Sequence, residues 1–218
     1  MAIAWPVLTD DYIEEKATSF RDTALGHLQL ENKGPVPVEQ IAEQYLGYDL
    51  DFVEDDGALP GDVIGGIDFD TNTITINSAI ESHLGRYSFT IAHEIAHHVL
   101  HKDLFLKARS GASIMCRGGK KRPIEEVQAD RFAEALLMPK ERVIEASYSL
   151  QTSRPLFRKS RIVLAARVIK ASGLTNVSVS AMDMRLQHLN LSTKPGWARE
   201  FMLYVIKQSL SKNKFWDR

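Results

Sequence analysis

The chain has 218 residues, of which 44% are hydrophobic and 25% charged, and its formal net charge is -1 at pH 7. This composition is that of a globular protein and excludes a disordered or fibrous chain. No stretch approaches the roughly 20 apolar residues that a membrane span needs, and the first residues lack a basic leader before a long apolar run. We therefore expect a cytoplasmic protein. The single cysteine, Cys116, fits a reducing compartment because it cannot form an internal disulfide.

The charges are distributed unevenly along the chain. Residues 1–81 contain 17 acidic and 3 basic residues, whereas residues 82–218 contain 11 acidic and 24 basic residues. Such a chain is expected to fold with two regions of opposite sign. Either these regions pack together and neutralise each other, or the basic region binds an acidic partner. Single-stranded DNA or another polyanion is therefore a candidate partner that could bind the basic region and activate the protein.

The first third of the chain changes from helical to strand periodicity. Residues 9–30 have helical spacing, and GPVPVEQIAEQYLG (34–47) indicates a helix opened by prolines and ended by a glycine. YDLDFVE (48–54) alternates as a strand, and VIGGIDFDTNTITINS (63–78) predicts two strands around the turn residues 70–72. The candidate inward positions of these two strands are Ile64, Ile67, Phe69, Ile74 and Ile76. A small antiparallel sheet is expected.

After the sheet the pattern is helical only. The expected helices cover about 86–102, 124–138, 160–171, 180–189 and an amphipathic stretch near 197–210. The segment QTSRP (151–155) is the best linker candidate. We therefore predict an α+β fold with one domain at 1–150, in which the small sheet packs on helices, and an all-helical region at 151–218.

The segment RYSFTIAHEIAHHVLHKD (86–103) contains a metal-binding pattern. His93 and His97 are four residues apart, so on a helix both rings lie on one face, about 6 Å apart along the axis, and can share one tetrahedral zinc. Glu94 lies beside the first histidine, where it can take a proton from an attacking water and pass it to a leaving amine. This HExxH arrangement is typical of zinc peptidases. His98 and His101 are expected to be packing or surface residues rather than ligands.

Three residues compete for the third ligand position. His101 continues the spacing, but its Cα would lie roughly 9 Å along the helix axis from a zinc held between His93 and His97. Asp103 would need a glycine three residues after His97 so that the chain could turn back, and Leu100 occupies that position. We therefore expect the helix to continue past both candidates.

The third candidate is Glu126, in PIEEVQADRFAEALLMP (123–139). On the predicted helix Glu126 and Asp130 lie one turn apart, close to the border of the apolar face. Glu126 can complete a set of two histidines and one carboxylate, and Asp130 can accept the free ring N–H of a histidine ligand. The alternative is a solvated face that forms ion pairs with Arg131 or Lys140.

Four segments together resemble the ImmA/IrrE family of bacterial zinc metallopeptidases, over roughly residues 36–191. They are GGIDFDTNTITINSAI, RYSFTIAHEIAHHVLH, EVQADRFAEALLMP and VSVSAMDMRLQHLNL. The resemblance implies His93, His97 and Glu126 as zinc ligands, Glu94 as the catalytic base, and a zincin-like sheet and helix joined to a helical part. It also implies cleavage of a helix-turn-helix repressor, which controls genes of mobile elements, stress response or phage defence. We expect that repressor to be a separate protein.

Two features of the sequence suggest regulation or substrate binding. Cys116 lies in the connection between the two site helices and is followed by basic residues, which favour the thiolate that a metal binds. It is thus a candidate inhibitory zinc ligand in the resting enzyme, and a buried inert thiol is the alternative. The glycines of VIGGIDFD (63–70) allow close backbone approach, so an exposed strand edge there is a candidate for pairing with a substrate peptide.

A different function class, DNA binding, also has some support. The stretch RIVLAARVIKASGLTNVSVSAMDMRLQHLNL (161–191) has a helix, a turn that contains Gly173 and a second helix, with basic residues just before it. Its spacing is loose for a helix-turn-helix motif. The rival hypothesis is therefore a DNA-binding regulator that uses the basic helical half.

Overall fold

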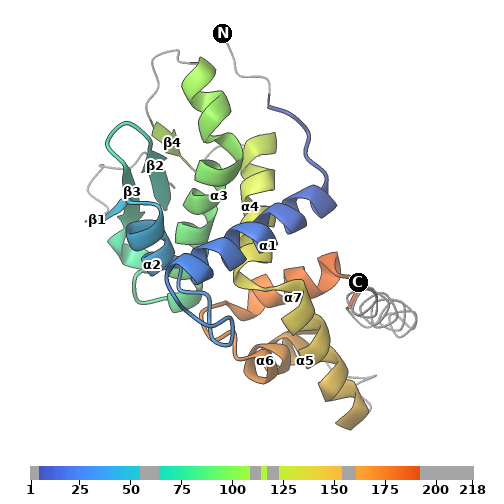
Figure 1. Ribbon diagram of the computed structural model, residues 1–218. Coiled ribbons are helices and arrows are strands. Elements are labelled where there is room, and N and C mark those ends of the chain that lie inside the picture. The colour runs from blue at the N-terminus through green and yellow to red at the C-terminus, as the bar shows by residue number, and fades with distance from the viewer. Residues whose placement is uncertain (1–4, 55–63, 109–113, 117–122, 154–160, 192–218) are drawn as a thin grey trace. The chain divides into compact units, whose positions relative to one another are not determined.

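The computed structural model of the chain describes residues 5–54, 64–108, 114–116, 123–153 and 161–191 (Figure 1). These residues form two compact units. The first contains the described residues up to Pro139 together with Gly173–Ser178, and the second contains those from Lys140 to Ser172 and from Val179 onward. The amphipathic helix expected near 197–210 lies outside the described residues. The division into domains at residue 150 stays a prediction.

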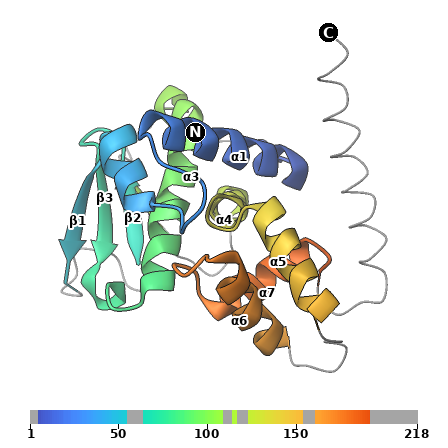
Figure 2. The ribbon, with the colours of Figure 1, turned by 60° about the horizontal axis from the view of Figure 1, so that its bottom comes forward.

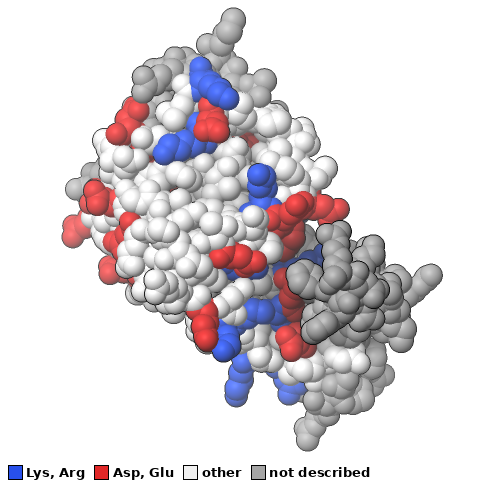
Figure 3. Space-filling view, viewed as in Figure 1, with Lys and Arg blue, Asp and Glu red and all other residues white. Residues whose placement is uncertain are grey.

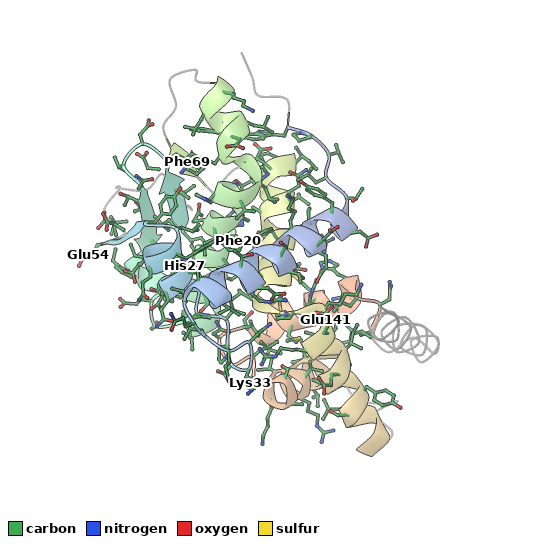
Figure 4. The ribbon with its side chains drawn as sticks, in the orientation of Figure 1. Phe20, His27, Lys33, Glu54, Phe69 and Glu141 are labelled. Carbon is green, nitrogen blue, oxygen red and sulfur yellow. The ribbon has the colours of Figure 1, made fainter. Side chains whose placement is uncertain are left out.

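The first unit begins with helix α1 (Asp10–His27), where a helix was predicted. The hydroxyl of Thr9 accepts a hydrogen bond from the backbone N–H of Tyr12 and caps the first turn. Phe20, labelled in Figure 4, lies with its ring centroid 5.9 Å from that of Phe132 and 5.8 Å from that of Tyr45. These aromatic contacts attach α1 to helix α4 (Ile124–Leu137) and to the short π-helix η1 (Ile41–Tyr45), which follows α2 (Val38–Gln40).

The sheet has four strands in the order β1-β3-β2-β4. They are β1 (Asp49–Val53), β2 (Gly65–Asp68), β3 (Thr73–Asn77) and β4 (Ile114–Cys116). The predicted hairpin is confirmed, since β2 runs antiparallel to β3, and β2 is also antiparallel to β4. The orientation predicted for β1 was wrong, because β1 runs parallel to β3 and the sheet is mixed. The alternation of apolar residues predicts which side chains face inward. It does not predict strand direction, because parallel and antiparallel strands show the same alternation.

The inner face of the sheet packs against the long helix α3 (Leu84–Ala108). Ile67, Ile74 and Ile76 are fully buried and Phe69 is 6% exposed, as predicted, whereas Ile64 is partly exposed. Phe69, labelled in Figure 4, makes an edge-to-face ring contact with Phe105 of α3 at 5.3 Å. Figure 2 shows the resulting layers of this unit: the sheet, then α3, then α4 with α1 beside it. The α+β fold class is therefore confirmed.

The close approach of residues 173–178 to α3 depends on one glycine. A Cβ added to Gly85 would lie 2.5 Å from the backbone nitrogen of Ser178 and 2.8 Å from the carbonyl carbon of Val177. Both neighbours are backbone atoms, so they cannot move aside by a rotamer change. The buried side chain of Asn176 also donates a hydrogen bond to the carbonyl oxygen of Val36 at 3.0 Å. These contacts make the segment part of the first unit.

The second unit consists of helices α5 (Lys140–Ser153), α6 (Arg161–Ser172) and α7 (Val179–His188). Helices α6 and α7 agree with the predictions, but α5 was not predicted, because Pro139 indicated an end. A proline is also tolerated at the start of a helix, so Pro139 separates α4 from α5 without excluding the second helix. The guanidinium of Arg161 donates to both carboxylate oxygens of Asp183, which fastens α6 to α7.

The surface of the first unit is acidic near its outer strand. Asp49 and Asp51 on β1 and Glu54 after it are exposed, and Figure 3 shows acidic side chains along the side of the molecule that carries this strand. None of the helices described here has the length and apolar character required to span a membrane.

Candidate metal centre

Helices α3 and α4 bring three potential ligands to one point. The Nε2 atoms of His93 and His97 are 3.1 Å apart. The carboxylate of Glu126 lies 3.3 Å from Nε2 of His93 and 3.4 Å from Nε2 of His97. All three residues are buried, and their ligand atoms lie within 4.8 Å of one another. Among the described His, Cys, Asp and Glu residues, these three form a group that can hold a metal ion.

The spacing of these atoms fits a tetrahedral metal. Ligand atoms placed about 2.0–2.1 Å from one zinc at tetrahedral angles lie roughly 3.3 Å from each other. The two Nε2 atoms are 3.1 Å apart, close to that value, and the two oxygens of Glu126 lie 3.3 Å and 3.4 Å from them, one oxygen near each ring. Two imidazoles and one carboxylate are also a ligand set that zinc accepts. The residues present therefore fit the metal that the sequence pattern predicts.

The electrostatics of the cluster favour a cation at the same point. Burial alone would lower the pKa of His93, but the hydrogen bonds to Asp130 and Glu126 and the charges of Glu94 and Glu126 outweigh it and raise this pKa to about 9. Burial alone would raise the pKa of Glu126, but its hydrogen bonds to His93 and His97 outweigh burial and hold that pKa far below its usual range. A positive charge is thus favourable between these groups, and a divalent cation would supply it.

Asp130 lies where the sequence predicted it. One of its carboxylate oxygens is 3.0 Å from Nδ1 of His93, and both residues are buried. A carboxylate can only accept, so Nδ1 of His93 donates to Asp130, and Nε2 is the ring nitrogen that remains to bind a metal in the cluster. The alternative of a solvated face does not agree with the structure, because Glu126 is 7% and Asp130 9% exposed.

The two rejected ligand candidates also lie as the helix geometry required. Helix α3 continues through residue 103 to Ala108, and Asp103 is exposed. His101 is not at the ligand position, but it is 1% exposed and its Nδ1 lies 3.0 Å from Nδ1 of His97. His101 is therefore a packing residue, as predicted, and it also contacts the site, which the sequence did not predict.

Comparison with known families agrees with this geometry. Residues 48–187 match the model of the Peptidase_M78 family, which is described as the IrrE N-terminal-like domain. The chain belongs to this peptidase family. The match confirms the resemblance to ImmA/IrrE proteins and includes both site helices. No curated protein matches the chain.

In this M78 peptidase, strand β2 packs directly against the residue predicted to be the catalytic base. Glu94 is 1% exposed and lies beside His93 on α3. A Cβ added to Gly65 of β2 would lie 2.5 Å from Cγ2 of Thr90 and 3.3 Å from Oε1 of Glu94. Glycine at position 65 therefore allows the strand to approach the helix at the point where the carboxylate of Glu94 lies.

The variant Gly65→Ala is expected to shift β2 and the carboxylate of Glu94. We expect a loss of about 1–3 kcal/mol in the free energy of unfolding, as for an overpacked core, together with reduced activity. Urea denaturation followed by circular dichroism measures the first effect. Gly26→Ala is the control, because a Cβ there meets nothing within 4 Å, and alanine favours a helix by up to about 1 kcal/mol. Equal stability of the two variants would contradict the close approach.

The prediction that β2 offers an exposed edge was wrong. Gly66 and Ile67 pair with residues of β3 on one side and of β4 on the other. The short strand β4 was not visible in the sequence, because three residues are too few to show alternation. In the observed order β4, which contains the backbone of Cys116, is the edge strand on this side. The thiol of Cys116 lies outside the described side chains, so its role as a zinc ligand stays a prediction.

His98 faces a different partner from its neighbours on α3. The hydroxyl of Tyr48 lies 2.9 Å from Nδ1 of His98, and burial followed by the charge of Asp68 raises the pKa of Tyr48 to about 12. The phenol therefore donates and the imidazole accepts. Burial, followed by the nearby charge of Lys102, lowers the pKa of His98 to about 4. The packing role predicted for His98 agrees with these contacts.

This contact predicts a loss of stability in acid. The pKa of His98 is about 4 in the folded chain and about 6.5 when unfolded, so the unfolded chain binds the extra proton first. The contribution of His98 is complete above pH 6.5 and is lost as the pH falls towards 4. We expect His98→Phe to reduce the slope of unfolding free energy against pH in this interval, measured with a chelator present. The exposed His83, changed to Phe, should leave the slope intact, and an equal reduction would contradict the assignment.

Proposed function

We propose that this M78 peptidase is a zinc-dependent endopeptidase of the cytoplasm that cleaves a separate helix-turn-helix transcriptional repressor. The observation that carries the proposal is the buried convergence of His93, His97 and Glu126, with Glu94 next to the first of them. Membership of the peptidase family supports proteolysis. The ligand set supports zinc. The family resemblance supports a repressor as the substrate. Its cleavage would switch on an operon for a mobile element, for phage defence or for a stress response such as the response to DNA damage.

Each residue of the site has a distinct task in this proposal. His93, His97 and Glu126 hold the zinc, which would supply Lewis-acid chemistry to the attacking water and the scissile carbonyl. Glu94 accepts the proton of the attacking water and transfers it to the leaving amine. Asp130 holds the ring of His93 in the tautomer that presents Nε2.

The substrate is tested with helix-turn-helix proteins encoded beside the gene for this chain. Each is incubated with the zinc-loaded protein, and the products are identified by mass spectrometry. We expect one of these proteins to be cut at a single position, and a chelator to prevent the cut. A zinc-loaded protein that digests unfolded casein but leaves every neighbouring repressor intact would contradict the proposed substrate.

The rival reading, DNA binding by α6 and α7, has weaker support from the described residues. Arg185 on α7 is buried, and Arg161 on α6 is hydrogen-bonded to Asp183. The turn between the helices, Gly173–Ser178, is part of the first compact unit. Activation by single-stranded DNA or another polyanion stays compatible with the basic half of the sequence. Salt-sensitive binding of an oligonucleotide would support that activation, and no binding at low salt would contradict it.

Cys116 gives a prediction about regulation. The backbone of Cys116 pairs with Gly66, which follows the glycine that packs against Glu94. The pairing alone does not carry the proposal, because Gly65, and not its neighbour Gly66, faces Glu94, and successive residues of a strand face opposite sides of a sheet. The proposal that the thiol is a removable zinc ligand of the resting enzyme rests on the basic residues that follow Cys116 in the sequence. Cys116→Ala is then expected to cleave the repressor without an activating signal, at a rate several times that of the unchanged protein, as measured by gel electrophoresis. Unchanged or lower basal cleavage would contradict inhibition by this residue.

A further inference from the structure

A chain of hydrogen bonds leads from the metal ligand His97 to the N-terminal segment. Nδ1 of His97 lies 3.0 Å from Nδ1 of His101, and Nε2 of His101 lies 3.1 Å from Oε1 of Gln128. Nε2 of Gln128 donates to the carbonyl oxygen of Pro6 at 2.6 Å. His97, His101 and Gln128 are each at most 2% exposed. The chain of contacts therefore runs through the interior and joins α3, α4 and the residues before α1.

The donor and the acceptor in each of these hydrogen bonds follow from the last group in the series, the carbonyl of Pro6. The carbonyl oxygen of Pro6 can only accept, so Gln128 must present its amide nitrogen to it and its oxygen to His101. That oxygen can only accept, so Nε2 of His101 carries a proton and Nδ1 of His101 is an acceptor. His97 must then donate from Nδ1, which leaves Nε2, the nitrogen that faces Glu126 and His93, to bind the metal.

We propose that His101 and Gln128 are positioning residues for His97, and that the carbonyl group of Pro6 fixes the tautomer of this metal ligand. The inference rests on the proposed function, because it concerns the same metal centre. It assigns to His97 the support that Asp130 gives to His93. The two histidine ligands differ in this respect. His93 is held by a carboxylate, whereas His97 is held by a neutral chain that adds no charge to the centre.

The segment before α1 takes part in this support. The ring of Trp5 lies edge-on to that of His101, with centroids 5.0 Å apart, so it limits rotation of the imidazole. Trp5 and Pro6 precede the region that matches the peptidase family, residues 48–187. A part of the chain outside the family match is therefore expected to contribute to metal affinity.

The test measures zinc affinity of the full-length protein by competition with a chromophoric chelator, and the visible spectrum of the cobalt(II)-substituted protein. His101→Phe keeps a ring beside Trp5 but removes both nitrogens. We expect it to bind zinc roughly 10-fold or more weakly, within the range for partners of metal ligands, and to shift the cobalt bands. His98→Phe is the matched control, because the next histidine on α3 contacts Tyr48 instead, and it should bind zinc as the unchanged protein does.

A second variant tests whether Gln128 acts on His97 through His101. Gln128→Leu should weaken zinc binding, and the double variant with His101→Phe should bind no more weakly than His101→Phe alone, because Gln128 acts through His101. His101→Gln, which retains an acceptor and a donor, should recover part of the affinity. Unchanged affinity and cobalt spectra in both single variants would overturn the inference alone. An unchanged protein that binds no metal would overturn the proposed function and this inference with it.

Discussion

Replacing Glu126 with alanine is expected to abolish stable metal binding, with a loss of affinity greater than about 100-fold. Partners that only orient a ligand contribute roughly 10- to 100-fold, and Glu126 contributes a ligand atom itself. Its carboxylate is the anionic member of the buried group with His93 and His97. Metal content of the purified protein, measured by inductively coupled plasma mass spectrometry, should fall from about one zinc per chain to nearly none.

The neighbouring Glu125 provides the control for this variant. It lies on the same first turn of α4 and is partly exposed, so Glu125→Ala should retain the metal. In the metal-free protein the change at Glu126 should also lower the pKa of His93, because Glu126 is one of the groups that raise it. Proton NMR titration of the ring measures that shift. Full zinc occupancy in Glu126→Ala would mean that the third ligand lies elsewhere in the chain.

The convergence of His93, His97 and Glu126 could be predicted because it depends on helical periodicity. His93 and His97 are one turn apart on α3, and Glu126 and Asp130 are one turn apart on α4, so each pair shares a face whatever surrounds it. Packing of two helices by their buried faces then brings the pairs together. The predicted hydrogen bond from a histidine ligand to Asp130, which His93 donates, needed only that one step of tertiary structure.

The hydrogen bonds that orient the ring of His97 could not be predicted in the same way. Gln128 and Pro6 are 122 residues apart in the sequence, and no local pattern indicates that they meet. The sequence analysis excluded His101 as a zinc ligand because of its distance from the zinc. That distance does not exclude a hydrogen bond between His101 and the predicted ligand His97. The parallel orientation of β1 was missed for a related reason, because it depends on where the chain crosses the sheet and not on which residues alternate.

Replacing Glu94 with glutamine is expected to reduce peptidase activity by about 10³-fold while zinc stays bound. General acid-base catalysis by one side chain contributes roughly 10²- to 10⁴-fold, and an amide cannot accept and return the proton. Glu94 is not a member of the ligand group formed by His93, His97 and Glu126. Activity and metal content should therefore separate in this variant, whereas both should fall together in Glu126→Ala.

Burial alone does not account for the expected loss, and a second buried carboxylate tests this. Glu134 on α4 is 3% exposed and pairs with Arg131, so Glu134→Gln also replaces a buried carboxylate by an amide. It is expected to alter stability but to retain catalytic turnover. Rates of repressor cleavage and zinc content measured together for both variants decide the question. A Glu94→Gln protein with full zinc and near-normal turnover would assign the proton transfer to another residue, because in that case the carboxylate beside His93 is not needed for the chemistry.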